Sequence, residues 1–254
     1  MGLRRYAVFN DIHFPYESKA YYRAIKIIQT WDNLAGIILN GDIAEIVTVS
    51  IHPKNPELDK FLNKEIDYTN SKFDDIQSNF QDIPVAYLEG NHEARIFRFI
   101  RDQCPQLWGL IDTPKLFRFD ERPGWKFFRH GPQQLVRIAK TDLYCRHEPL
   151  AMGQNPAKIT AENSYVDIIF GHVHTYQEYT HKKFGPVPKT TRAYANGWLG
   201  DKCHSIFDYR GPRDRWVEGF GDVLVDDISW EYQYNFVDLS HHNPFYEAPK
   251  QTTR

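Results

Sequence analysis

The chain has 254 residues, of which 41% are hydrophobic and 25% charged, and its formal net charge is −2. This composition is typical of a soluble globular protein, and the small net charge argues against a protein that binds nucleic acid through its overall field. The sequence shows no apolar run of the roughly 18 residues that a membrane span needs, and Cys104, Cys145 and Cys203 are spaced as in a cytoplasmic protein with reduced cysteines.

The first hundred residues alternate between short apolar runs and longer amphipathic segments. We expect strands at residues 6–9, 34–39 and 83–88, where apolar residues are nearly continuous. We expect helices at residues 20–31, 57–80 and 91–104, where apolar residues recur every three to four positions. This alternation predicts an α/β architecture built in layers.

The second half of the chain has a different pattern. We expect strands at residues 125–129, 135–138, 142–145 and 166–170, the last buried on both faces because it is almost entirely apolar. The aromatic-rich sequence after residue 192 predicts hairpins, and we expect Trp198, Trp216 and Phe220 in the core. A single domain over residues 1–254 is expected, with residues 194–254 forming strands that close it.

Five short polar clusters interrupt this pattern, and most of them directly follow a predicted strand. They are Asp11-Ile12-His13, Gly41-Asp42, Gly90-Asn91-His92-Glu93, His147 and Gly171-His172-Val173-His174. Ligands of α/β proteins collect at the carboxyl ends of strands, and glycine lets the backbone turn sharply beside a bound group. We therefore expect the clusters to meet at one edge of the fold.

The side chains in these clusters offer oxygen and nitrogen atoms, which are the donor types of hard and borderline metal ions. Carboxylates, an amide and imidazoles without thiolates suit Mn²⁺, Fe or Zn²⁺. A carboxylate such as Asp42 can bridge two cations, and His172 and His174 can reach different ions from one turn. Two neighbouring metals can clamp a phosphoryl group and lower the pKa of a water molecule. We expect Glu45 and Glu93 to orient the groups around them.

The motifs Asp-x-His, Gly-Asp, Gly-Asn-His-Glu, His and Gly-His-x-His, in this order over residues 6–176, resemble the calcineurin-like metallophosphoesterases. The resemblance implies a four-layer sandwich of two mixed β-sheets flanked by helices. It also implies hydrolysis of phosphate esters by in-line attack of a hydroxide that bridges two divalent metal ions. Mn²⁺ is the expected metal, with Fe, Zn²⁺, Ni²⁺ and Mg²⁺ as alternatives.

The resemblance further assigns the ligands of both metals, with Asp42 shared. One metal would be held by Asp11, His13, Asp42 and His174. The other would be held by Asp42, Asn91, His147 and His172. The catalytic histidine would be His92, which protonates the leaving oxygen or stabilises charge on the phosphate.

The fifth motif leaves two candidates. In the family this histidine is usually followed by glycine, as His130 is by Gly131, whereas His147 is followed by Glu148 and Pro149. We prefer His147 because it follows a predicted strand and lies closer to the last motif. His130 remains the alternative.

Residues 89–95, together with Arg98 and residues 104–107, resemble the nuclease-like metallophosphoesterases of bacteriophages and bacteria; for a phage protein the location would be the host cytoplasm. Residues 95–146 contain 11 Lys or Arg against 5 Asp or Glu. Arg95 is the expected phosphate-binding residue, because a guanidinium can grip a phosphate with two hydrogen bonds. We therefore expect phosphodiester substrates from DNA, RNA or nucleotides.

Three alternatives stay open. The first is a phosphomonoesterase, although Ile43-Ala44-Glu45 does not match the Val-Asp-Arg-Gly of protein phosphatases. The second is a metal-free scaffold that binds a protein, which predicts lost ligands. The third is binding of nucleic acid without cleavage.

Overall fold

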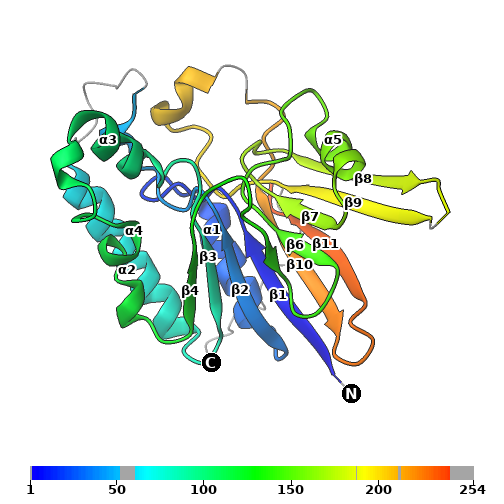
Figure 1. Ribbon diagram of the computed structural model, residues 1–254. Coiled ribbons are helices and arrows are strands. Elements are labelled where there is room, and N and C mark those ends of the chain that lie inside the picture. The colour runs from blue at the N-terminus through cyan, green and yellow to red at the C-terminus, as the bar shows by residue number, and fades with distance from the viewer. Residues whose placement is uncertain (1, 52–60, 187, 211–212, 241–254) are drawn as a thin grey trace, which may run out of the picture.

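The computed structural model describes residues 2–51, 61–186, 188–210 and 213–240, and their strands form two sheets (Figure 1). The first sheet has the order β11-β10-β1-β2-β3-β4. Strands β1 to β4 are parallel, whereas β10 runs antiparallel to β1 and β11 antiparallel to β10. These strands are β1 (Leu3–Phe9), β2 (Leu34–Asn40), β3 (Val85–Leu88), β4 (Trp125–Phe128), β10 (Gly219–Asp226) and β11 (Tyr232–Asp238).

The second sheet is also mixed and has the order β5-β6-β7-β9-β8. Its central strands β6, β7 and β9 are parallel, and its outer strands β5 and β8 are antiparallel to their neighbours. These strands are β5 (Val136–Arg137), β6 (Leu143–Cys145), β7 (Asp167–Phe170), β8 (Tyr176–Lys183) and β9 (Lys189–Asn196).

Two of the α-helices, α1 and α5, are capped at their N-termini by a side chain. Helix α1 begins after Ser18, whose hydroxyl accepts the N–H of Ala20, and α5 begins after Asn155, whose side chain accepts the N–H of Lys158. The α-helices are α1 (Lys19–Gln29), α2 (Leu62–Asn79), α3 (Arg95–Gln103), α4 (Thr113–Leu116) and α5 (Pro156–Asn163). The 3₁₀ turns are η1 (Val47–Val49), η2 (Pro105–Leu107), η3 (Phe119–Glu121) and η4 (Ser205–Arg210).

Three buried apolar clusters lie between four layers. Phe9 and Tyr87 of the first sheet pack with Phe73 of α2, whereas Val8, the neighbour of Phe9, packs on the opposite face with residues of the second sheet. The outer face of the second sheet is covered by α5. This arrangement of helix, sheet, sheet and helix confirms the fold that the motif resemblance implied.

Several elements differ from the sequence prediction. The helix expected at 57–80 is seen as α2, and residues 57–60 lie outside the described part of the chain. The helix expected from residue 91 begins only at Arg95, because residues 91–94 form a turn. Helix α5 and strand β8 were not predicted, so the first C-terminal hairpin begins at Tyr176 rather than after residue 192. Residues 241–254 of the expected closing strands are not described.

Candidate metal centre

Each of the polar clusters follows a strand, as expected. Asp11 and His13 follow β1, Asp42 follows β2, and Asn91 and His92 follow β3. Because these strands are parallel neighbours, their carboxyl ends lie together at the end of the sheet opposite the N-terminus (Figure 1). In the second sheet, His147 follows β6, and His172 and His174 follow the parallel strand β7.

Nearly all of these side chains are shielded from solvent. Those of Asp11, His13, Asp42, His92, His147 and His174 are at most 2% exposed. Asn91 and His172 are only half-buried. The site is therefore approached from the side on which Asn91 and His172 lie.

The first group of donor atoms consists of Asp11, His13 and His174. Nε2 of His174 lies 3.2 Å from Oδ1 of Asp11 and 3.2 Å from Nε2 of His13. Two imidazole nitrogens and one carboxylate oxygen thus converge in a buried space. This donor set suits a divalent cation of the Mn²⁺, Fe or Zn²⁺ type.

The second group consists of Asp42, His147 and His172, with Asn91 beside them. Nε2 of His147 lies 3.1 Å from Oδ2 of Asp42 and 3.1 Å from Oδ1 of Asn91. The same amide oxygen lies 2.7 Å from Nδ1 of His172. All of the side chains expected around the second metal therefore meet at one point.

Asp42 belongs to the second group, and its charge also affects the first. Its Oδ1 accepts the backbone N–H of His92 at 2.8 Å, whereas its buried Oδ2 faces imidazole nitrogens, with Nε2 of His147 at 3.1 Å and Nε2 of His92 at 3.6 Å. Burial opposes the charge of Asp42, but His147 and His92 hold the pKa of its carboxyl well below the usual value. Its negative charge also favours the protonated forms of Asp11 and of His13, and so acts to raise the pKa of both. A buried carboxylate oxygen that faces the nitrogens of two imidazoles fits a cation at this position.

The backbone at the site is strained. Nine described residues other than glycine have φ between 50° and 67°, in the left-handed region, and five of the nine are expected ligands: Asp11, His13, Asp42, His172 and His174. Such conformations cost about 1–3 kcal/mol each and cluster at functional sites. Close packing also requires glycine at position 90, because a Cβ atom there would lie 2.2 Å from Oδ1 of Asp42.

Glu45 and Glu93 hold this arrangement in place, in the orienting role expected of them. Oε2 of Glu45 lies 2.8 Å from Nδ1 of His92 and 2.6 Å from Nδ1 of His13. Burial opposes the charge of Glu45, but the two histidines keep its pKa well below the usual value. Glu93 accepts the backbone N–H groups of Ile43 at 2.7 Å and of Gly90 at 2.8 Å, which ties the turn after β2 to the turn after β3.

Arg95 lies directly beside His92. Its NH1 donates to the backbone oxygen of Glu45 at 2.7 Å and to Oε1 of that residue at 3.0 Å, and its NH2 donates to Nε2 of His92 at 2.9 Å. The side chain of Arg95 is thus almost buried between two polar groups. Arg98, one turn further on α3, is exposed and donates to the backbone oxygen of Asn91 at 2.6 Å.

His130 lies outside both groups of donor atoms. Its backbone N–H donates to Oε2 of Glu89 at 3.0 Å, and its Nε2 lies 3.5 Å from Oε2 of Glu148. His147, in contrast, contacts both Asp42 and Asn91. The geometry therefore favours His147 over His130 as the proposed fifth-motif ligand.

Aromatic side chains around the first group were not foreseen as part of the site. Trp198 is fully buried and stacks on His174 with ring centroids 4.8 Å apart. Phe207 meets the ring of His13 at 5.2 Å, and the half-buried Trp216 meets His174 at 4.5 Å. Phe220 is in the core, as expected. The only sequence signal for these contacts was the density of aromatic residues after residue 192.

Comparisons with known proteins give one family match. The model of the calcineurin-like phosphoesterase family matches residues 4–176, whereas no curated protein matches the chain. Among the described residues, no helix has the length and apolar character needed to cross a membrane.

Solved structures similar to this chain include two from eukaryotes and one from a bacterium. Vacuolar Protein Sorting 29 from Cryptosporidium parvum is 11% identical with a TM-score of 0.42, over 94% of this chain and 99% of that one. Vps29 from Chaetomium thermophilum is 8% identical with a TM-score of 0.42, over 93% and 95%. The nuclease MPE from Pseudomonas putida is 11% identical with a TM-score of 0.37, over 91% and 86%.

Proposed function

The chain belongs to the calcineurin-like phosphoesterase family, many of whose members are metal-dependent hydrolases of phosphate esters. We propose that it is a dinuclear-metal phosphodiesterase acting on nucleic acid or nucleotides. The observation that carries the proposal is the convergence of two groups of donor atoms, one of Asp11, His13 and His174 and the other of Asp42, His147 and His172. A chain that had become a metal-free scaffold would not need to bury the carboxylate of Asp42 against the imidazoles of His147 and His92.

The proposed ligands are those expected from the motifs. Asp11, His13 and His174 would hold one ion, Asn91, His147 and His172 the other, and Asp42 both. Two bound divalent cations, with Mn²⁺ as the proposed metal, supply positive charge for the phosphoryl oxygens and lower the pKa of a water molecule.

His92 and Arg95 are the proposed groups of the chain that act on the phosphate. Glu45 holds Nδ1 of His92, so that Nε2 faces Asp42 at 3.6 Å and Arg95 at 2.9 Å. An oxygen of the substrate that reaches Nε2 is therefore also within reach of the guanidinium. We assign Arg95 to a phosphate oxygen, and His92 to the leaving oxygen, to which Nε2 donates a proton or hydrogen bond when Arg95 has exchanged its bond to that nitrogen for the phosphate.

The preference for diesters is supported by the charge around the open side of the site. Arg98 lies exposed against the backbone of Asn91, one of the two half-buried ligands. It belongs to the segment of residues 95–146, which has 11 Lys or Arg against 5 Asp or Glu. A local cationic surface favours a substrate with several phosphates over an isolated monoester.

The decisive test compares two chromogenic esters in the presence of Mn²⁺. We expect turnover of bis-p-nitrophenyl phosphate to exceed that of p-nitrophenyl phosphate, and we expect a chelator to abolish both. The variant His92→Ala serves as a control for contaminating activity. Turnover of the monoester alone would favour a phosphomonoesterase, and a purified protein with neither metal nor activity would favour a scaffold.

We also propose that residues 1–254 form one domain in the cytoplasm. The C-terminal strand β10 pairs with the N-terminal strand β1 over six residue pairs, which places both ends of the described chain in one sheet. Cys104, Cys145 and Cys203 are all free, whereas disulfides are typical of secreted proteins.

A further inference from the structure

The loop between β4 and β5 forms a cavity that is open to solvent. It has a volume of about 620 Å³ and is lined by residues 127–135. Sites for small molecules commonly have volumes of roughly 300–1,000 Å³. Its lining places the apolar side chains of Phe128 and Leu135 beside the polar side chains of Arg129, His130 and Gln134.

Two of the lining residues form hydrogen bonds with the segments that carry proposed metal ligands. Gln134 accepts the backbone N–H of His147 through Oε1 at 3.2 Å and donates to the backbone oxygen of Glu89 at 2.9 Å. The backbone N–H of His130 donates to the side chain of Glu89 at 3.0 Å. Glu89 comes two residues before Asn91 in the chain. Hydrogen bonds therefore connect the loop that lines the cavity to the two segments that carry Asn91 and His147 of the second group.

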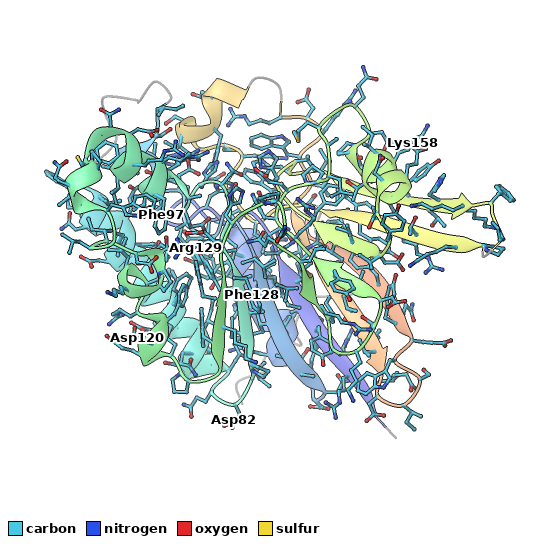
Figure 2. All side chains as sticks on the ribbon, in the orientation of Figure 1. Asp82, Phe97, Asp120, Phe128, Arg129 and Lys158 are labelled. Carbon is cyan, nitrogen blue, oxygen red and sulfur yellow. The ribbon has the colours of Figure 1, made fainter. Side chains whose placement is uncertain are left out.

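Arg129 of this loop lies against an aromatic ring of α3, and that ring contacts a second one. The side chain of Arg129 is 48% exposed, and its guanidinium lies 4.3 Å from the ring centroid of Phe97. Figure 2 shows the two side chains next to each other between α3 and β4. Phe97 in turn meets Trp108, which is 60% exposed. Arginine together with exposed aromatic rings is the combination with which proteins bind single-stranded nucleic acid.

We propose that the cavity of residues 127–135 is a subsite for the nucleoside next to the scissile phosphate of a single strand, and that Arg129 binds the following phosphate. This inference rests on the proposed phosphodiesterase function. The apolar lining covers the base and sugar, and the cation meets the next negative charge along the strand. Arg129 now pairs with Asp112 at 2.7 Å, but an exposed ion pair is weak and can be exchanged for a phosphate.

The first test places a negative charge in the cavity. Leu135 is 44% exposed, so Leu135→Asp is tolerated by the fold. Leu3→Asp makes the same change at a leucine that is 55% exposed at the opposite end of the first sheet. The probe is a fluorescein-labelled octathymidylate whose phosphorothioate links resist hydrolysis, titrated in Mn²⁺ and followed by anisotropy. We expect Leu135→Asp to weaken binding about tenfold or more and Leu3→Asp to change it less than about twofold.

The second test removes a positive charge. Arg129→Ala is compared with Lys126→Ala, which removes an exposed cation from β4 that does not line the cavity. We expect only Arg129→Ala to weaken binding and to lower the slope of log affinity against log salt concentration by about one. The subsite would be overturned if both members of each matched pair lost the same binding affinity, or if neither member lost any. It would also be overturned if the unmodified protein did not bind the probe.

A parallel activity measurement distinguishes a failure of the subsite from a failure of the proposed phosphodiesterase function. Turnover of bis-p-nitrophenyl phosphate by the unmodified protein is measured in parallel. Turnover without the contrast between Leu135→Asp and Leu3→Asp would refute the subsite alone. The binding contrast without turnover would refute the phosphodiesterase function and leave a nucleic-acid-binding site. A melting temperature for each variant identifies any loss that comes from unfolding.

Discussion

Asp42 and His92 are in contact at two points. The backbone N–H of His92 donates to Oδ1 of Asp42 at 2.8 Å, and Nε2 of the His92 ring lies 3.6 Å from Oδ2. The first contact does not depend on the side chain of His92, whereas the second does. Substitutions of these two residues should therefore have different effects on metal content, although both should lower activity.

We expect His92→Ala to keep both metals and lose activity. The backbone hydrogen bond that orients Asp42 remains in this variant, and none of the proposed ligands is removed. Loss of a group that acts as a general acid lowers a rate by about 10²–10⁴-fold. Metal content per chain from mass spectrometry and kcat for bis-p-nitrophenyl phosphate check this prediction. A variant that loses a metal ion would show that His92 is a ligand.

Asp42→Asn should lose metal as well as activity. The amide has no charge and only one acceptor oxygen, so it cannot replace a carboxylate that faces His147 and the cations at the same time. We expect metal content below that of the unmodified protein and a loss in kcat of about 100-fold or more, beyond the range for groups that only support a ligand. The control is Asp142→Asn, at a carboxylate whose side chain is 77% exposed. Full metal content in Asp42→Asn would contradict the bridging role.

The two histidine candidates for the fifth motif can be separated by metal content. His147→Ala removes an imidazole that lies 3.1 Å from both Asp42 and Asn91, so one ion per chain should be lost. His130→Ala removes only the contact with Glu148 and should keep both ions. Equilibrium dialysis against Mn²⁺ followed by metal analysis measures the difference. The reverse result would make His130 the ligand.

The positions of the metal-site motifs could be anticipated because they depend on a short-range pattern and a general rule. Apolar runs identified the strands, and parallel strands bring their carboxyl ends together. This reasoning placed Asp11, Asp42 and Asn91 at one edge of a sheet. It could not say how far each side chain is from its neighbours, because the distances depend on turns such as residues 91–94, which interrupt the expected helix.

The missed features depend on contacts between distant parts of the chain. Helix α5 has only eight residues, and it is held by packing of Ala157 and Ala161 on the second sheet rather than by a strong apolar period. Trp216 reaches His174 from 42 positions away in the sequence. The bonds from Gln134 to His147 and Glu89 are equally non-local. Local periodicity in the sequence cannot predict such contacts. The sequence therefore indicated the proposed ligands better than the side chains that pack around them.

The ion pair between Asp74 of α2 and Arg122 predicts a pH dependence of stability. NH1 of Arg122 lies 2.6 Å from Oδ1 of Asp74, and the side chain of Arg122 is 4% exposed. Burial opposes the charge of Asp74, but Arg122 and Arg118 together outweigh it and lower the pKa of this carboxyl in the folded state. A lowered folded-state pKa contributes stability above the ordinary pKa of about 3.9, and this stability is lost as the pH falls through the folded-state value.

We therefore expect Asp74→Asn to lower the free energy of unfolding at pH 7, and the deficit to shrink as the pH falls below about 4. Because the side chain of Asp74 is 55% exposed, solvent screening limits the effect to about 1 kcal/mol or less. Arg122 keeps its hydrogen bonds to Asn70 and Phe117 in the variant, so the buried guanidinium is not left alone. Urea unfolding at pH 7 and pH 3.5 measures the difference. The control Asp75→Asn alters a carboxylate that is 63% exposed and lies 3.6 Å from Lys72. A deficit that is independent of pH would show that the cost of Asp74→Asn comes from packing and not from the charge.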